Sequence, residues 1–313
     1  MSLEAAARYF ARPAQRPERN QYGRPRVCTG EEMATPPRPL NALLLCGGGS
    51  RGAIEIGLYK ALTDHHIPID LIFGTSVGAI NGALIAAGLT SDRLATLWTQ
   101  FERKPLFRVN WRILWEGWRV PALFRAERLA DVLRSALPVR RFDELSLPLV
   151  VTATDFHTGQ AVYLDSGDLL PALLASAALP PFLPPVEYEG RLLVDGGIVA
   201  NLPIGEAVAR GATRVFALSC HCLQELTQPP RGVLDIQARA LRIAIERQMR
   251  FEIACCRDRA ELIVLEPCFD FPPSLLKPAG VASLIEQGYA FVSAELQRRD
   301  LTRAPEMTAE AGR

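Results

Sequence analysis

Two short glycine-containing motifs carry residues that could perform chemistry. In the first, Gly-Gly-Gly-Ser-Arg-Gly at 47–52, three glycines directly follow the apolar residues 42–46. In the second, Gly-Thr-Ser-Val-Gly at 74–78, a serine stands between two glycines behind another apolar stretch. Backbone without side chains can bind phosphate, stabilise the oxyanion of a reaction intermediate, or form a tight turn. The first motif alone leaves these three possibilities open.

The first motif fits a nucleotide site only in part. Gly47, Gly49 and Gly52 satisfy the G-x-G-x-x-G pattern of dinucleotide-binding folds, with an apolar run before and a helical segment after. That function also requires an acidic residue near the carboxyl end of the next strand, where it binds the ribose. Here the acid, Asp70, stands at the amino end of the apolar residues 71–73. A nucleotide-binding oxidoreductase is therefore an alternative that the spacing does not favour.

The second motif predicts a nucleophile at Ser76. In G-x-S-x-G sequences the serine stands on a sharp strand-to-helix turn, and flanking glycines such as Gly74 and Gly78 let neighbouring backbone pass. Ser76 would project at the amino end of a helix that begins near Val77, where the helix dipole favours negative charge. The competing interpretation is a serine that only caps this helix. The apolar strand directly before the motif favours the nucleophile.

A serine nucleophile gives the glycine loop a second interpretation. Attack on an ester turns the carbonyl oxygen into an oxyanion, and each backbone N–H that stabilises it contributes about 3–4 kcal/mol. Consecutive amides of Gly47, Gly48 and Gly49 could turn toward one point. Arg51 could steady this loop or bind an anionic head group, and the helix after Gly52 adds its positive end.

A serine also needs a proton acceptor, and the chain has four histidines. His65 and His66 are adjacent at the end of a predicted helix, and His157 lies in a predicted turn between strands. His221 is the only histidine that follows a plausible triad acid, in the order Ser, Asp, His of the α/β-hydrolases. It is the histidine candidate for the base.

Asp195 is the other candidate for the base. It ends the apolar run 191–195 and is followed by Gly196, Gly197 and a helix predicted to begin near Pro203. The residue could simply form an Asx turn. A carboxylate with a pKa near 4 matches a serine hydroxyl poorly unless burial raises that pKa and the two groups lie close together.

The elements that must position these residues alternate along the chain. Strand-like apolar runs lie at 42–46, 69–73, 147–154, 191–195, 214–219 and 261–266, and segments of helical spacing at 52–66, 76–88, 203–211 and 236–260. The alternation predicts an α/β fold with a mainly parallel sheet covered by helices on each side. In such sheets ligands bind beyond the carboxyl ends of the strands, where both motifs stand.

The two ends of the chain differ from this pattern. Residues 1–39 are rich in Arg, Pro and Ala without any period, and predict a poorly ordered tail. Residues 40–300 predict the folded domain, and residues 301–313 a second, shorter tail.

Composition bounds the possible partners. Hydrophobic residues make up 49% of the 313 residues, charged residues 22%, and the net charge is +1, so a large core is possible and nucleic acid is not an expected partner. We expect no transmembrane helix, because the longest apolar run, 77–89, is too short. Arg8 and Arg12 interrupt the only stretch that resembles a secretory signal. Nothing in the pattern specifies an oligomeric state.

The cysteines predict a reducing compartment. Seven of them, an odd number, indicate buried free thiols rather than a disulfide framework. Cys220 and Cys222 around His221, and the adjacent Cys255 and Cys256, lack the spacing of a zinc site, and no calcium-site pattern is present. We expect a protein without metal or cofactor, located in the cytoplasm or peripherally at a membrane.

Three segments together resemble the patatin-like phospholipase family, in its bacterial-type form: residues 47–52, 74–78 and the Asp-Gly-Gly at 195–197. The stretch 175–204 is also similar to the family's approach to its aspartate, and the resemblance covers roughly residues 41–300. The family usually has Pro-Gly-x-Phe-Pro-Pro in this stretch, whereas residues 179–185 here read Leu-Pro-Pro-Phe-Leu-Pro-Pro.

The resemblance implies a three-layer α/β/α domain with a Ser-Asp dyad and no catalytic histidine. By motif, Ser76 is the nucleophile and Asp195 the proton acceptor. The oxyanion hole is formed by Gly47, Gly48 and Gly49 with support from Arg51. The remaining motif glycines, which shape the turns, are Gly52, Gly74, Gly78, Gly196 and Gly197. His221 becomes a structural residue.

Residues 106–124 contain three of the four tryptophans, at 111, 115 and 118, at spacings that predict one helical face. Arg108, Arg112 and Arg119 are interleaved with them, a mixture typical of lipid interfaces. The segment is either a lid or membrane-docking element, or a helix whose aromatic stripe packs on the core.

These observations predict a serine acyl hydrolase that cleaves fatty acyl esters of lipids or phospholipids. The alternatives are an α/β-hydrolase-type esterase that uses His221 in a triad, the nucleotide-binding oxidoreductase, and a lipid-binding module without turnover.

Overall fold

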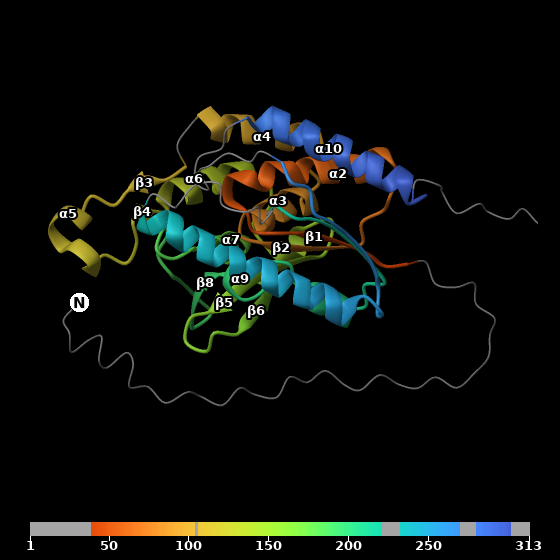
Figure 1. Cartoon of the computed structure of the whole chain (residues 1–313). Coiled ribbons are helices and arrows are strands. Elements are labelled where there is room, and N and C mark those ends of the chain that lie inside the picture. The colour runs from red at the N-terminus through yellow and green to blue at the C-terminus, as the bar shows by residue number, and fades with distance from the viewer. Residues whose placement is uncertain (1–38, 104–105, 221–231, 270–279, 302–313) are drawn as a thin grey trace, which may run out of the picture. The chain divides into compact units, whose positions relative to one another are not determined.

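The computed structural model describes residues 39–103, 106–220, 232–269 and 280–301, which form a mixed α/β fold around one large sheet (Figure 1). Hydrogen-bonded strands follow in the order β10, β9, β1, β2, β5, β8, β7, and β6 also pairs with β5. The first five of these strands are parallel. The bounds are β1 Asn41–Leu45, β2 Leu71–Thr75, β5 Leu149–Asp155, β6 Ala161–Leu164, β7 Val186–Tyr188, β8 Arg191–Asp195, β9 Arg214–Leu218 and β10 Glu261–Leu265.

The central strands are covered on both faces. Every residue of β1 is buried, which is expected of a parallel strand between helical layers. Figure 1 shows α2, α4 and α10 gathered above the sheet, while α9 lies apart from this group and packs against α8. The helices are α2 Ile54–Asp64, α3 Val77–Ala86, α4 Ser91–Arg103, α6 Glu127–Ala136, α7 Leu169–Ser176, α8 Ile204–Ala209, α9 Val233–Cys256 and α10 Val281–Arg298. The predicted α/β fold with a mainly parallel sheet is confirmed.

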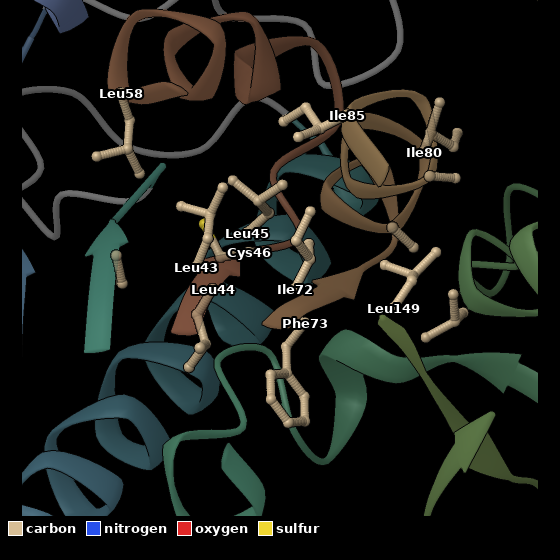
Figure 2. Close-up of a cluster of buried hydrophobic side chains, with 14 of the residues drawn as sticks. Leu43, Leu44, Leu45, Cys46, Leu58, Ile72, Phe73, Ile80, Ile85 and Leu149 are labelled. Carbon is tan, nitrogen blue, oxygen red and sulfur yellow. The ribbon is translucent and has the colours of Figure 1, made fainter. Parts of the chain in front are cut away.

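The core beneath the two motifs consists of aliphatic side chains from several elements (Figure 2). Leu43 and Leu45 of β1 and Ile72 of β2 are completely buried, and Ile85 of α3 is nearly so. Burying a side chain of this size stabilises the fold by about 1.5–3 kcal/mol. This packing holds the carboxyl ends of β1 and β2, where the two glycine motifs begin, in a fixed relation.

The register shows that β2 and β8 share one edge of β5. Thr152 of β5 pairs with β2 and with β6, whereas Ala153 pairs with β8 and with β6. A strand has two hydrogen-bonding edges, so β2 and β8 must follow each other along the edge opposite β6. Because β2 is parallel to β5 and β8 is antiparallel, these two strands run toward each other. Their last residues, Thr75 and Asp195, meet between Thr152 and Ala153.

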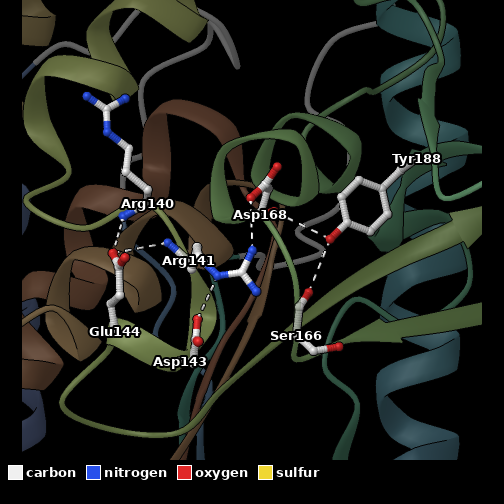
Figure 3. A network of polar contacts seen from close by, with 7 residues as sticks. All are labelled: Arg140, Arg141, Asp143, Glu144, Ser166, Asp168 and Tyr188. Carbon is white, nitrogen blue, oxygen red and sulfur yellow. Dashed lines mark hydrogen bonds and ion pairs between the residues drawn. The ribbon is translucent and has the colours of Figure 1, made fainter.

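A polar network supports the start of α7 (Figure 3). The Tyr188 hydroxyl lies 3.1 Å from the carbonyl oxygen of Ser166 and 3.4 Å from that of Asp168, directly before the helix. Arg141 bonds to the carboxylates of Asp143 at 3.1 Å and Asp168 at 3.4 Å. Since these ion pairs are exposed, each contributes little to stability. The hydrogen bonds of the Tyr188 hydroxyl are partly buried, so they contribute more to the position of α7 than the exposed ion pairs of Arg141 do.

The prediction that Trp111, Trp115 and Trp118 share the face of one helix is wrong. The chain instead forms a two-stranded ribbon, β3 Arg108–Val109 with β4 Phe124–Arg125, and between these strands lie α5 Ile113–Glu116 and a 3-10 turn. Gly117 ends α5 because its φ of 56° lies in a region that a continuing helix cannot use. Figure 1 shows α5 projecting from the body of the fold.

The ribbon carries exposed tryptophans. Trp111 is 64% and Trp115 is 71% exposed, so these two rings do not pack on the core. The side chain of Trp118 lies outside the described residues.

The predicted tails, 1–39 and 301–313, lie almost wholly outside the described residues. Within the described ranges, no helix is both long and apolar enough to cross a bilayer.

Candidate active site

Ser76 occupies a strained turn between β2 and α3. Its backbone angles, φ 55° and ψ −122°, are unusual for a residue with a side chain. A Cβ on Gly78 would lie 2.2 Å from the carbonyl oxygen of Leu45, so the turn passes directly against the end of β1. The Ser76 side chain makes no capping hydrogen bond to α3. The interpretation of Ser76 as a helix cap is therefore wrong.

Asp195 ends β8 and is 3% exposed. Its Oδ1 accepts a hydrogen bond from the Gly197 amide at 2.8 Å, so the predicted Asx turn is present. The Ser76 side chain lies close enough to favour the ionised carboxylate, which lowers the pKa of Asp195. Burial is the larger effect and raises that pKa to about 6. The two residues that the motifs singled out thus line the same cavity, and the Asx turn of Asp195 is compatible with that position.

A buried serine of α7 holds the backbone of Ser76. The Ser76 amide donates to Ser176 Oγ at 2.8 Å, and Ser176 Oγ donates to the carbonyl oxygen of Thr152 at 2.6 Å. The strained turn is therefore tied to the point on β5 where β2 and β8 meet. Sequence reasoning missed Ser176, because a serine inside an apolar helix has no spacing that marks its partner.

The glycine loop holds its three amides in different ways. The Gly47 amide donates to Asn201 Oδ1 at 3.0 Å, so it is already engaged. Within the described part of the chain, the amides of Gly48 and Gly49 have no such acceptor, and both residues line the same cavity as Ser76. Gly49 has a φ of 58°, which favours glycine. The geometry thus leaves Gly48 and Gly49, rather than Gly47, as donors toward the cavity.

Asn201, which follows the Asp-Gly-Gly segment 195–197, joins that segment to the glycine loop. Besides accepting from Gly47, its side-chain amide donates to the Gly47 carbonyl oxygen at 3.4 Å. A Cβ on Gly197 would lie 2.9 Å from Asn201 Oδ1, which explains a glycine there. Sequence reasoning missed Asn201, although it lies in the quoted stretch 175–204, because nothing local marks it as the partner of a loop so distant in the chain.

Arg51 lies behind the loop instead of in the cavity. It is 6% exposed and does not belong to the cavity lining. Burial lowers the pKa of Arg51, and the nearby Arg242 lowers it further. Of its two predicted roles, steadying the loop fits this position, and binding a head group does not.

The cavity in front of Ser76 has a volume of about 130 Å³ and is mainly apolar. Its walls include Trp98, Phe101, Leu129, Leu133, Phe182 and Ile245. The stretch 179–185, where the chain departs from the family pattern, supplies three wall residues, Leu179, Phe182 and Leu183. Among the described lining residues, only Asp195 and Arg242 carry charge.

The described histidines lie away from this site. His65 follows α2 as its C-cap, His66 adjoins it, and His157 lies in the turn between β5 and β6, as predicted. His221 lies outside the described residues. Asp70 binds the Asn41 amide at 2.8 Å, at the amino ends of β1 and β2, so it is at the wrong edge of the sheet for a ribose.

A second cluster lies behind the glycine loop and could hold a metal ion. The side chains of Cys46, Glu55 and Cys220 are buried, and their ligand atoms lie within 4.8 Å of one another. The Cys220 amide donates to Cys46 Sγ at 3.2 Å, and Asn81 donates to Glu55 Oε2 at 2.9 Å. Burial raises the pKa of Glu55 well above its ordinary value. Three separate elements supply the ligands, so no spacing in the sequence could reveal this cluster.

The described cysteines include both free thiols and one that is disulfide-bonded. Cys46, Cys220 and Cys256 are buried free thiols, as expected, and Cys255 is an exposed one. Cys268 is disulfide-bonded, which departs from the expectation of free thiols only.

The site thus combines a strained serine, a buried carboxylate and a glycine loop around one mainly apolar cavity. The family model "Patatin-like phospholipase" matches residues 43–208, more than half of the chain. The chain belongs to the patatin-like phospholipase family.

Several proteins are similar to this chain over part of their length. An NTE family protein of Mycobacterium bovis is 33% identical over 181 residues, which cover 58% of this chain and 49% of that protein. Patatin-like phospholipase domain-containing protein 7 of Rattus norvegicus is 28% identical over 278 residues, which cover 83% of this chain and 20% of that protein. The chain thus spans about half the length, or less, of these relatives. Among solved structures, VipD from Legionella pneumophila aligns with a TM-score of 0.46 and 13% identity, covering 84% of this chain and 67% of that one.

The buried Glu55 predicts a measurable pH dependence of stability. Because its pKa is raised in the folded state, its contribution to stability is complete below the ordinary value of 4.5 and is lost as pH rises toward the folded value. Glu55→Gln keeps the shape and cannot ionise. We expect this variant to gain more than about 1 kcal/mol over the wild type between pH 5 and pH 8, measured by urea unfolding. The exposed Glu187→Gln is the control, and parallel pH curves for wild type and Glu55→Gln would contradict the prediction.

Proposed function

We propose that the protein is a serine acyl hydrolase that cleaves fatty acyl esters of lipids. The observation that carries this proposal is that the strained Ser76 and the buried carboxylate of Asp195 line the same mainly apolar cavity. Ser76 Oγ attacks the ester carbonyl carbon while its proton passes to the Asp195 carboxylate. The carbonyl oxygen then carries the negative charge, and the amides of Gly48 and Gly49 donate to it.

The second half of the reaction returns the proton. As the tetrahedral intermediate collapses, the ester bond breaks and Asp195 gives its proton to the departing alcohol. Water then attacks the acyl-serine, again losing its proton to Asp195, and the fatty acid leaves as Ser76 recovers its hydrogen. Family membership supports a lipid substrate. Phospholipids are the substrates that the family's description suggests.

The raised pKa of Asp195 suits this role. A carboxylate with a pKa of about 6 is mostly ionised at pH 7, yet it is more basic than an ordinary aspartate. A carboxylate that serves as the base for a serine needs a raised pKa, and burial supplies that increase for Asp195. The alternatives of a His221 triad, of an oxidoreductase and of a lipid-binding module gain no specific observation from the described residues.

We further propose peripheral contact with a membrane from the cytoplasmic side, through the ribbon 106–124. Trp111, Leu114 and Trp115 are largely exposed at its tip. Exposed arginines, including Arg108 and Arg112, accompany them. Exposed aromatic rings with adjacent cations favour the boundary between lipid head groups and acyl chains.

Labelling with a fluorophosphonate probe tests the nucleophile. We expect Ser76→Ala to lose labelling and to hydrolyse a long-chain ester at least about 10³-fold more slowly, because the attacking oxygen is gone. Ser166→Ala, an exposed serine outside the cavity, is the control. Asp195→Asn should reduce hydrolysis by a similar factor, whereas His221→Ala should retain it. The opposite ranking of these two variants would establish a triad, and an unlabelled wild type would indicate a binding module.

The pH profile tests the base. Because Asp195 must be ionised to accept the proton, kcat/KM for a soluble short-chain ester should rise with pH, reach half its maximum near pH 6 and level off above pH 7. Circular dichroism at each pH confirms that the protein stays folded. A profile that is flat from pH 5 to pH 8 would exclude Asp195 as the base.

Liposome binding tests the ribbon. We expect the double variant Trp111→Ala/Trp115→Ala to bind phosphatidylglycerol-containing vesicles about 10-fold more weakly, while hydrolysis of a short soluble ester changes less than about twofold. Phe251→Ala, which removes an exposed ring from α9, is the matched control. Equal losses of binding and hydrolysis would show that the tryptophans support the fold instead.

A further inference from the structure

One face of α9 forms part of the lining of the cavity that contains Ser76. Ala238, Leu241, Arg242 and Ile245 all line it, at the spacing of a single helical face. Three of these side chains are apolar and match the other walls. Arg242 is the exception, because it brings a permanent positive charge into a mainly apolar space that contains Ser76 and Asp195.

Among the described residues, none forms a hydrogen bond or an ion pair with the Arg242 guanidinium. Within the described residues, its Nε is buried and has no hydrogen-bond partner. Arg250, on the same helix, shows the ordinary arrangement, since it bonds to Glu246 at 2.6 Å and reaches Glu266 at 3.7 Å. No comparable ion pair is present for Arg242 in this part of the chain.

The charges around Arg242 leave the region positive. Arg239 and Arg51 lie near enough to act on it unfavourably, and Asp235 offsets them in part. Burial is the largest effect and lowers the pKa of Arg242, as expected for a cation taken out of water. An anion bound in the cavity would offset the desolvation cost of the Arg242 guanidinium and its repulsion by the neighbouring arginines.

A phosphate group fits this position chemically. The planar guanidinium offers parallel N–H donors that match two phosphate oxygens, and such charge-assisted bonds are strong in a dry cavity. The apolar walls suit the acyl chain of a lipid. In a phosphoglyceride the phosphate and the ester share one glycerol unit, so both can occupy one cavity.

We propose that Arg242 forms a phosphate subsite, which binds the phosphorylated head group of the lipid whose ester is presented to Ser76. This inference rests on the proposed hydrolase function and narrows its substrate class to lipids with a phosphate near the ester. Arg242 is a specificity-determining residue, since it selects the phosphorylated lipid without touching the reacting atoms.

Two substrates with the same acyl chain test the subsite. Oleoyl lysophosphatidic acid and monooleoylglycerol differ only in the phosphate, and released oleate gives kcat/KM for each. We expect the wild type to prefer the phosphorylated lipid, and Arg242→Ala to lower the ratio of the two kcat/KM values by about 10- to 100-fold. Arg242→Lys should restore part of the ratio, because it keeps the charge and loses the fork. Arg247→Ala, an exposed arginine of the same helix, is the control and should leave the ratio unchanged.

A binding measurement separates this inference from the function on which it rests. In the Ser76→Ala background, lysophosphatidic acid should bind more tightly than monooleoylglycerol, and Arg242→Ala should remove that difference. If the wild type binds the phosphorylated lipid through Arg242 but hydrolyses neither substrate, the proposed function is wrong and the subsite stands. If Arg242→Ala leaves the ratio unchanged, or weakens both lipids equally, the subsite is overturned.

Discussion

The site depends on how β5 shares one of its two hydrogen-bonding edges. Because β2 and β8 approach along that edge from opposite directions, their carboxyl ends meet head to head, which brings Ser76 and Asp195 together. A purely parallel sheet would place a following strand beside β2, one strand spacing away, with its end level with that of β2. The reversed direction of β8 lets a residue distant in the sequence face the nucleophile without a long loop.

The head-to-head arrangement of β2 and β8 also explains why Gly78 and Gly196 are glycines and why the pKa of Asp195 is raised. Where two strands end against each other, little space remains for side chains: a Cβ on Gly196 would lie 2.3 Å from the Thr152 carbonyl oxygen, as one on Gly78 would contact Leu45. The same crowding excludes water from Asp195, and desolvation is what raises its pKa to about 6. Close packing and the basicity of the carboxylate are thus two results of one arrangement.

Short sequence patterns predicted those features of the fold that depend only on neighbouring residues in the chain. Six strands of the large sheet and the helices α2, α3, α8 and α9 could be read from short apolar runs and helical spacing, whereas α4 and α10 were missed. The turn residues Ser76 and Asp195 could be read from glycine spacing, because the backbone conformation of those turns demands particular residues. Asn201 and Ser176 could not, since each acts on a partner that only the fold brings near. The prediction for residues 106–124 failed because the tryptophan spacing is compatible with a helix. The actual conformation depends on the pairing of β3 with β4 and on Gly117, which the spacing does not reveal. Which amide of the glycine loop is engaged likewise depends on Asn201.

Charge movement in the proposed reaction accounts for the sparse polar lining. When Ser76 attacks, its proton neutralises Asp195 and the negative charge moves to the carbonyl oxygen, so the net charge of the cavity does not change. The apolar cavity therefore bears no cost for creating charge, only for moving it a short way, and the amides of Gly48 and Gly49 favour the new position. Arg51, buried behind the loop, adds a fixed positive potential that favours an anion there without competing for contact with the substrate. An ionised head group is a separate charge that the reaction does not move, so it needs a separate cation, and Arg242 of α9 lines the same cavity as Ser76.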